Sequence, residues 1–444
     1  MAKEKAFGVA GAVLLGIGSM VGAGIFIVIG QAGAIAGNIL WLSFLLGGVA
    51  ALLSGYSLAK LALRYPSRGG IAEYLVQGFG EGVFSGSASV LLYFSQLVAI
   101  AAVAKSFGVY ASTLVGAGEG IWVNVFSIGI VALFTVINLI GAAVVAKSEN
   151  IIVGIKITIL VAFAVAALFT IKPQLLSSSD MPSMSNMLFA IGLTFFAYQG
   201  FSIITNTVED MRNPKKTMMR SMIIAIVLVG LLYVTMSIAV LGNLSLENVI
   251  KTKDFALAQA AKPIFGEWGF KVIAATALLA TASAINATLY AATDISYSMA
   301  KDGNLPEVYE HSVYQSYDGL IISALLIVPM ILFFDLAQIT TVAALVVLMI
   351  QGLTHVGHLR HIKETGANVW LVSGAALAMF GIAGLTVTYT YEQAHEIIYL
   401  IVASLAMALG IELLMRRMTG RVVKSMIREF SHIEDEAEEL IKKL

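Results

Sequence analysis

The sequence predicts an all-α membrane protein whose chain crosses the bilayer many times. Of its 444 residues, 59% are hydrophobic and only 12% are charged, and the mean hydropathy is +0.89. A soluble chain of this length carries about 25% charged residues. Uncharged apolar runs recur along the sequence, and each reaches the length of about 20 residues that spans a bilayer as a helix.

Twelve such segments are expected, followed by a mixed-charge tail. In order they cover residues 7–36, 39–63, 82–113, 122–145, 149–171, 185–208, 217–242, 264–300, 318–334, 337–359, 367–390 and 393–416, and the tail covers 417–444. The apolar part of the first segment is about twice as long as that of a signal peptide. We therefore expect the first segment to be retained as a membrane span.

The distribution of basic residues predicts an orientation. An even number of helices places both ends of the chain on one side of the membrane. Twenty of the 27 basic residues lie on that side, five lie in the opposite loops, and two, Lys105 and Lys156, lie within segments. Because basic loops stay in the cytoplasm, we predict a multi-pass protein of the cell (plasma) membrane with both termini cytoplasmic.

Glycines interrupt the first segment. The stretch GIGSMVGAGIF, residues 16–26, contains four of them, although glycine weakens a helix interior by about 1 kcal/mol relative to alanine. The spacing of Gly18 and Gly22 is typical of two helices that pack closely. The alternative is a break in the helix, which is tolerated at membrane depth only where the backbone is buried in protein or lines a polar cavity.

The sixth segment carries a second interruption, at FFAYQGFS, residues 195–202, with Gly200 in its middle. The two interruptions are five helices apart, which is an odd number, so the two halves of the chain would be inverted in the membrane. Paired interruptions in two inverted halves indicate a substrate site at the membrane midplane of a transporter.

Broken helices at this depth suit a zwitterion. The freed N–H groups of a second half-helix can bind a carboxylate, and the freed carbonyls of the first can receive an ammonium. Small residues there let the ligand reach the backbone. The pattern therefore favours an α-amino acid as the substrate.

Four motifs resemble those of the amino acid–polyamine–organocation (APC) family of transporters. They are GIGSMVGAGIF, the sixth-segment stretch FFAYQGFSIITNTVEDMRNPKKT at 195–217, YPSRGGIAEY at 65–74 and YSMAKDGNLPE at 297–307. Their order is that of the family. One departure is the sequence Lys216-Thr217-Met218, which lacks the proline that often follows Asn-Pro-Lys and affects only a helix start.

The resemblance implies a LeuT-type fold with broken helices one and six and twelve transmembrane helices. Two five-helix inverted repeats, 1–175 and 185–360, are expected to be followed by two extra helices, 365–416, and the cytoplasmic tail, 417–444. The resemblance also implies a substrate site, with Phe196 at an aromatic gate. Its expected residues are Ser19, Met20, Gly22, Ala23, Gly24, Phe196, Ala197 and Gln199.

Lys156 lies within the fifth segment. An intramembrane ammonium is a functional candidate by default, but the segment start is only about 10 Å away at 1.5 Å per residue, so snorkelling to the interface is an equal alternative. A lysine at this position resembles that of the proton-coupled members of the family, where it takes the place of a sodium ion. The resemblance implies that Lys156 couples transport to protons, with Gly18 and Ser283 as its neighbours.

Two other groups of residues have simpler expectations. Lys105 lies near the outer end of the third segment, where snorkelling is favoured. His355, His358 and His361 recur every three residues at the end of the tenth segment beside basic residues. We expect them to form a wet helix end rather than a metal site.

The predicted function is uptake of amino acids by proton symport through alternating access, with an amino acid or amine exchanger without proton coupling as the alternative. No carboxylate or arginine lies near the breaks, which favours neutral L-amino acids and broad specificity. The chain shows no channel filter, no soluble output domain of a sensor and no HExxH or GxSxG motif of an enzyme. We expect no cofactor besides the proton, membrane lipid as surroundings, and, at zero net charge, no nucleic-acid partner. The oligomeric state stays open.

Overall fold

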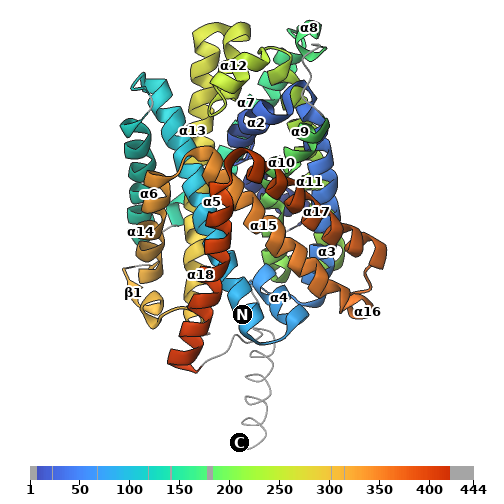
Figure 1. The fold of residues 1–444 in the computed structure, drawn as a ribbon, viewed down its shortest axis with the longest axis vertical. Coiled ribbons are helices and arrows are strands. Elements are labelled where there is room, and N and C mark those ends of the chain that lie inside the picture. Colours follow the sequence, from blue (N-terminus) through green and yellow to red (C-terminus); the bar gives the residue numbers. More distant parts are fainter. Residues whose placement is uncertain are drawn as a thin grey trace, which may run out of the picture.

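The computed structural model shows a bundle of long helices standing side by side (Figure 1). It describes residues 8–22, 24–67, 69–118, 120–140, 143–177, 184–301, 303–314 and 316–420, with the backbone alone for 143–150 and 419. The short helices α4 and α16 lie at the lower end of the bundle in this view, and α8 and α12 lie at the upper end. These are called the α4–α16 end and the α8–α12 end below.

The first half of the chain is helical almost throughout. Its elements are α1 (Val9–Met20), α2 (Gly24–Ala36), η1 (Gly37–Ile39), α3 (Leu40–Arg64), α4 (Ile71–Phe79), α5 (Val83–Val115), α6 (Ile121–Ile140), α7 (Ala143–Leu168), α8 (Pro173–Leu176), α9 (Met184–Phe189), α10 (Ile191–Tyr198) and η2 (Gln199–Asp210), where η marks a 3₁₀ helix.

The second half adds one small sheet. Its elements are α11 (Pro214–Leu241), α12 (Leu246–Lys251), α13 (Ala256–Lys301), η3 (Glu307–Glu310), β1 (Ser312–Val313), β2 (Ser316–Tyr317), α14 (Asp318–Phe333), α15 (Leu336–Leu359), α16 (Ile362–Thr365), α17 (Val369–Ala394) and α18 (Glu396–Thr419). The strands pair antiparallel, with Ser312 opposite Tyr317 and Val313 opposite Ser316.

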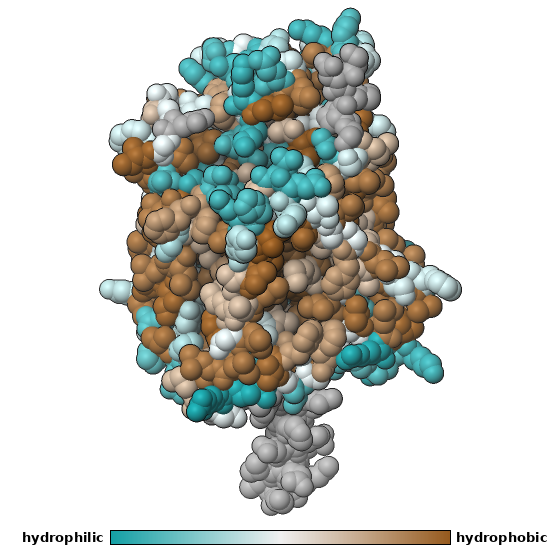
Figure 2. All heavy atoms as spheres, in the orientation of Figure 1, coloured by the Kyte–Doolittle hydropathy of each residue, from teal (hydrophilic) through white to brown (hydrophobic). Residues whose placement is uncertain are grey.

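The chain is a multi-pass membrane protein. Within the described residues, ten helical stretches are long and apolar enough to cross a bilayer, and α1 and α14 are shorter apolar helices. All twelve predicted segments fall on helices. Apolar side chains dominate the flanks of the bundle, while hydrophilic ones gather toward its two ends (Figure 2). The all-α prediction is confirmed, and the count of twelve crossings stays a prediction.

Pairs of helices far apart in the sequence form the core. The bundle packs α3 against α11, α5 against α13, and α15 against α17. Small residues permit these contacts, because the Cβ atom of an alanine in place of Gly55 of α3 would lie 2.8 Å from Ile226 of α11. Close packing at glycines also holds the interrupted helices against neighbouring helices.

Two predicted segments differ from the structure. The eighth, expected at 264–300, begins at Ala256, and its backbone leaves the helical region at Gly266, with φ 65° and ψ −157°. Glycine adopts this conformation without strain, so two helices meet at a kink there, and the predicted start at 264 lies close to the start of the second helix. The sixth segment is not unwound at 195–202: it changes from α to 3₁₀ winding at Gln199 and stays 3₁₀ for twelve residues.

Candidate functional site

The first helix of the chain is broken at the glycine cluster. Helix α1 ends at Met20, Val21 and Gly22 form a turn, and α2 begins at Gly24, while Ala23 lies outside the described residues. The last carbonyls of a helix have no amide partner within it. The predicted interruption of the first segment is confirmed, and it exposes backbone oxygens inside the bundle.

Two of these oxygens are occupied by side chains from other helices. The carbonyl of Gly18 accepts a hydrogen bond from Nζ of Lys156, at 2.9 Å. The carbonyl of Met20 accepts one from the hydroxyl of Tyr233, at 2.6 Å. A buried carbonyl without a partner is costly, so these two side chains stabilise the break.

Tyr233 of α11 joins the two interrupted helices. Its hydroxyl also contacts the carbonyl of Ala197 in α10, at 3.2 Å, and the residue is fully buried. Its ring packs against Phe44 and Tyr198, with centroids 5.4 and 5.1 Å away. This contact could not be predicted from the sequence, because a tyrosine within an apolar run gives no sign of which way its hydroxyl points.

Glycines allow the two interruptions to touch. The Cβ atom of an alanine in place of Gly24 would lie 2.8 Å from both Cα and O of Ala197. The Cβ atom of an alanine in place of Gly200 would lie 2.5 Å from the backbone of Ser19 and Met20. These are backbone contacts that cannot give way, so glycine is required where α1, α2, α10 and η2 meet.

Other glycines of the cluster serve helix packing. A Cβ atom at Gly18 would lie 2.8 Å from Val153 of α7, and one at Gly22 would lie 3.1 Å from Ala284 of α13. The close-packing interpretation of Gly18 and Gly22 therefore holds beside the break.

The expected substrate residues lie together but differ in exposure. Met20, Phe196 and Ala197 are buried, Gln199 is half-buried, and Ser19 is exposed. Gly22 lies in the turn between α1 and α2, and Gly24 is the first residue of α2. The structure thus brings the described members of the predicted set to one junction, and their role in binding stays a prediction.

Lys156 points into the bundle. The residue is 1% exposed, and its ammonium lies on the Gly18 carbonyl rather than at an interface. Ser283 is also buried, on α13, which packs against α7. The snorkelling alternative is wrong for Lys156. An ammonium held at a helix break by backbone oxygen can exchange its proton only when water reaches it.

Lys105 is half-buried. Its Nζ donates to Oδ1 of Asn124 in α6, at 2.8 Å, and to the carbonyl of Ile331 in α14, at 2.7 Å. Asn124 lies near the start of α6 and Ile331 near the end of α14, so the ammonium is held at the ends of these helices, and its snorkelling stays a prediction.

A chain of polar side chains begins at the helix-six junction. Nε2 of Gln351 in α15 donates to Oε1 of Gln199, at 2.8 Å. Oε1 of Gln351 accepts from the hydroxyl of Ser54 in α3, at 2.7 Å. The Ser54 hydroxyl also lies 2.9 Å from Nε2 of His355. Gln351, Ser54 and His355 are all 0% exposed.

The chain continues to the α4–α16 end. Nδ1 of His355 and Nδ1 of His358 each lie 2.8 Å from the hydroxyl of Ser57. Nε2 of His358 lies 2.9 Å from Oγ1 of Thr365, whose hydroxyl contacts the carbonyl of His361, at 3.1 Å. His358 is 1% exposed. The expectation of a wet helix end is wrong for two of the three histidines, because hydroxyls of α3 face them. No group able to hold a metal ion occurs among the described residues.

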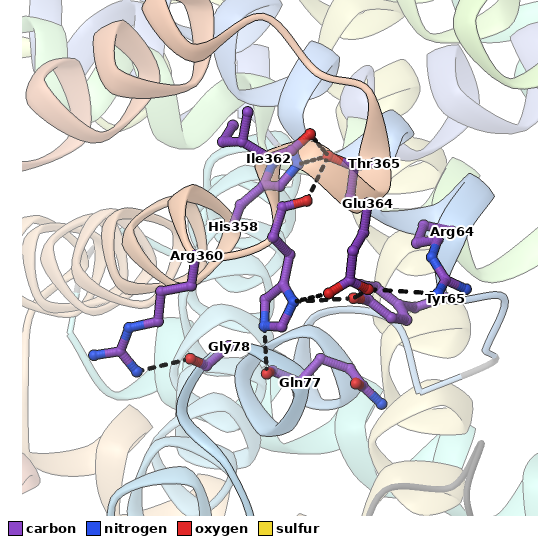
Figure 3. A network of polar contacts seen from close by, with 10 residues as sticks. Arg64, Tyr65, Gln77, Gly78, His358, Arg360, Ile362, Glu364 and Thr365 are labelled. Atoms are coloured by element: carbon purple, nitrogen blue, oxygen red, sulfur yellow. Dashed lines mark hydrogen bonds and ion pairs between the residues drawn. The ribbon is translucent and has the colours of Figure 1, made fainter.

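An ionic cluster closes the α4–α16 end (Figure 3). The Tyr65 hydroxyl donates to Glu364, at 2.8 Å, Arg64 lies 3.4 Å from the same carboxylate, and Nδ1 of His361 lies 3.1 Å from its other oxygen. Burial and the bond to Glu364 raise the pKa of Tyr65 to about 12. Hydrogen bonds from His361 and Tyr65 lower the pKa of Glu364. The cluster ties the end of α3 to α16.

Helices α4 and α15 cross at two glycines near this cluster. A Cβ atom at Gly78 would lie 2.6 Å from Cα of Gly357. Arg360 donates from Nη1 to the carbonyl of Gly78, at 2.8 Å. The short helix α4 is therefore fixed directly beneath the histidine chain.

An apolar cavity of about 260 Å³ lies elsewhere, between α5, α14, α15 and α18. Phe94, Met330 and Leu400 line it. Its walls offer few polar groups to orient a zwitterion, so it does not compete with the helix junction as an amino acid site.

Comparison with known proteins gives one consistent result. The profile of the amino acid permease family matches residues 7–410. The inner membrane transport protein YbaT of Escherichia coli is 34% identical over 93% of this chain and 97% of its own length. An uncharacterized protein of Methanocaldococcus jannaschii is 35% identical over 94% and 97%. The serine/threonine exchanger SteT of Bacillus subtilis is 28% identical over 68% and 70%.

Proposed function

The chain belongs to the amino acid permease family, an APC family of transporters, and on that premise we propose that it takes up neutral L-amino acids by proton symport. The substrate would bind where α1, α2, α10 and η2 meet, and the bundle would open to each side in turn. A role in uptake implies the cell membrane, and the excess of basic residues on the side of the termini implies that both termini are cytoplasmic.

One observation carries the proposal. The ammonium of Lys156 is buried and bonded to the Gly18 carbonyl beside the helix break. A buried charge of this kind is costly unless paired, so loss of its proton in one state of the transport cycle would release α7 from α1. Gly18 belongs to the same broken helix as the expected substrate residues Ser19 and Met20, which would link the proton to the substrate.

The neutral preference follows from the surroundings of the junction. The described side chains around the Tyr233 hydroxyl at the junction, Tyr233, Phe44 and Tyr198, are uncharged. An acidic or basic substrate side chain would lie there without a partner of opposite charge.

The test is uptake into proteoliposomes of the full chain. A panel of labelled amino acids is offered in sodium-free buffer with an alkaline lumen. We expect accumulation above equilibrium that a protonophore abolishes. Lys156→Ala should abolish the response to the pH gradient, whereas Lys105→Ala, which removes an intramembrane ammonium bonded to α6 and α14, should retain it. Equal responses from both variants would contradict the assignment of Lys156.

Exchange is the second candidate, because one relative is named a serine/threonine exchanger. In that mechanism uptake requires amino acid preloaded in the lumen and ignores the pH gradient. The same vesicles, loaded and unloaded, separate the two mechanisms, and Lys156 would then be a structural cation.

A further inference from the structure

The polar chain between α3 and α15 contains six hydrogen-bonding contacts, called links here. Its neutral groups supply too few hydrogens to fill all of them. Six links run from Oε1 of Gln351, through Ser54, His355, Ser57, His358 and Thr365, to the carbonyl of His361. Both ends of the chain are acceptors. The three hydroxyls and two neutral imidazoles between them supply five hydrogens, so one link stays unmade in the neutral chain.

A sixth hydrogen completes every link. If either imidazole is protonated, both of its nitrogens donate, and all six contacts become hydrogen bonds. The Ser57 hydroxyl lies 2.8 Å from both imidazoles. When a hydrogen passes from Nδ1 of one imidazole to the Ser57 oxygen and the Ser57 hydrogen passes to Nδ1 of the other, the charge moves between His355 and His358 without moving any heavy atom.

The neutral chain has another solution. The amide of Gln351 can rotate by 180°, which exchanges its oxygen and nitrogen at nearly the same positions. Its Nε2 then donates to the Ser54 oxygen. The Ser54 and Ser57 hydroxyls donate to the next imidazole along the chain, and the Thr365 hydroxyl donates to the carbonyl of His361. The five hydrogens of the chain and the one from the amide then fill all six links. The Gln351 oxygen then faces Gln199 and requires that Gln199 donate from its own amide nitrogen.

The two arrangements present Gln199 differently. In the structure Gln199 accepts from Gln351, and its amide nitrogen has no acceptor among the described residues, so it is available as a donor. In the rotated arrangement that nitrogen is used, and the oxygen is available instead. Gly200, next to Gln199, packs against Ser19 and Met20 at the first break.

We propose that His355 and His358 form a proton-binding site, and that its occupancy sets through Gln351 whether Gln199 offers a donor or an acceptor at the helix junction. With the proton bound, the junction gains an N–H group for the carboxylate of a substrate. Without it, a carbonyl oxygen faces the same carboxylate. The effect on substrate rests on the proposed amino acid transport; the proton site itself does not.

The groups that face the pair most closely carry no negative charge, so they oppose a bound proton. Lys60 of α3 and His361 face His358, and His358 faces His355. Glu364 and Tyr65 lie beyond His361.

The other neighbouring helices offer the pair no counter-charge. Helix α10 contains no charged residue, α5 contains only Lys105, bonded to α14, and α17 contains only Glu392, three residues from its far end. Glu73 of α4 bonds Gln77, and Glu412 of α18 bonds Arg416. A proton on the pair would therefore be held by hydrogen bonds alone, in a chain that runs to the α4–α16 end.

The proton site is tested without substrate. The full chain, labelled with ¹⁵N-histidine in lipid nanodiscs, is titrated between pH 5 and 8, and the signals of His355 and His358 are identified by their loss in His355→Asn and His358→Asn. We expect both to shift in one shared transition that adds a single proton. Two imidazoles that stay neutral throughout, or titrate independently, would overturn the site.

The coupling is tested by binding of labelled L-alanine to the purified chain across the same pH range. In the wild type we expect affinity to weaken about tenfold per pH unit above the transition, as linkage of one proton requires. Gln351→Met should lose this part of the pH dependence, and Ser54→Ala, which interrupts the chain one link further on, should lose it too. Ser43→Ala, which removes a buried α3 hydroxyl bonded to Met187, should keep the wild-type slope.

A wild-type slope in both Gln351→Met and Ser54→Ala overturns the coupling. A wild type that binds no amino acid of a wider panel contradicts the proposed function, whereas the histidine titration is judged independently of that result.

Discussion

Removal of one hydroxyl, in Tyr233→Phe, tests whether the two broken helices are held together from α11. The ring keeps its packing against Phe44 and Tyr198, so the change isolates the bonds to the carbonyls of Met20, at 2.6 Å, and Ala197, at 3.2 Å. Leaving a buried carbonyl unsatisfied costs about 1–3 kcal/mol, and hydrogen bonds between membrane helices average about 0.6 kcal/mol with a maximum of about 1.7. The single hydroxyl hydrogen is shared between the two carbonyls, so we expect a loss of about 2 kcal/mol in the free energy of unfolding, within the range for one unsatisfied carbonyl.

The assay is unfolding of the purified protein in mixed micelles, with Tyr110→Phe as the matched control. Tyr110 is also fully buried, but its hydroxyl donates to a single carbonyl, that of Phe26 within α2, at 3.2 Å. We expect the control to lose about 0.6 kcal/mol in the free energy of unfolding. If Tyr233→Phe loses no more stability than Tyr110→Phe, the reasoning that Tyr233 joins the two interruptions is refuted.

Two further predictions concern the junction and the α4–α16 end. Gly200→Ala places a Cβ atom 2.5 Å from the backbone of Met20, so we expect uptake to be lost. The control Gly129→Ala, with open space around its Cβ position, should transport normally. Equal uptake by the two variants would contradict the close approach of the two interruptions. The pKa of Glu364 is lowered from 4.5 in the folded protein, so its contribution to stability is present above pH 4.5 and disappears as the pH falls through the lowered value. Glu364→Gln should therefore lose less stability than the wild type as the pH falls from 6 to 3, as measured by thermal unfolding. An acid dependence of stability equal to that of the wild type would contradict the role of the Glu364 bonds to Tyr65 and His361.

Much of the architecture was predictable because it depends on hydrophobic periodicity and chain length. Every predicted segment fell on a helix, and the glycine cluster predicted the break between α1 and α2. The boundary at Ala256 was missed because the run before Gly266 is less apolar and contains Pro263. The winding of η2 was missed because α and 3₁₀ helices share the same residues and differ only in hydrogen bonding.

Some of the polar contacts could likewise be predicted from the sequence, and others could not. The resemblance implied that Lys156 and Gly18 are neighbours, and the structure places them 2.9 Å apart; their role in proton coupling stays a prediction. Tyr233 and the histidine chain could not be derived, because each depends on which side of a helix faces which partner across more than 200 residues of sequence. Adjacent Arg360 and Lys363 suggested water around His355 and His358, yet α3 covers both imidazoles.

The 3₁₀ winding of η2 makes this segment longer than the same residues would be in an α-helix. A 3₁₀ helix rises about 2.0 Å per residue and an α-helix about 1.5 Å, so the twelve residues of η2 span about 24 Å, against about 18 Å if rewound. A change from one winding to the other would therefore move the Asp210 end by about 6 Å relative to Gln199 without breaking the chain or sliding α10. The length of this segment is thus set by whether each N–H bonds three or four residues back.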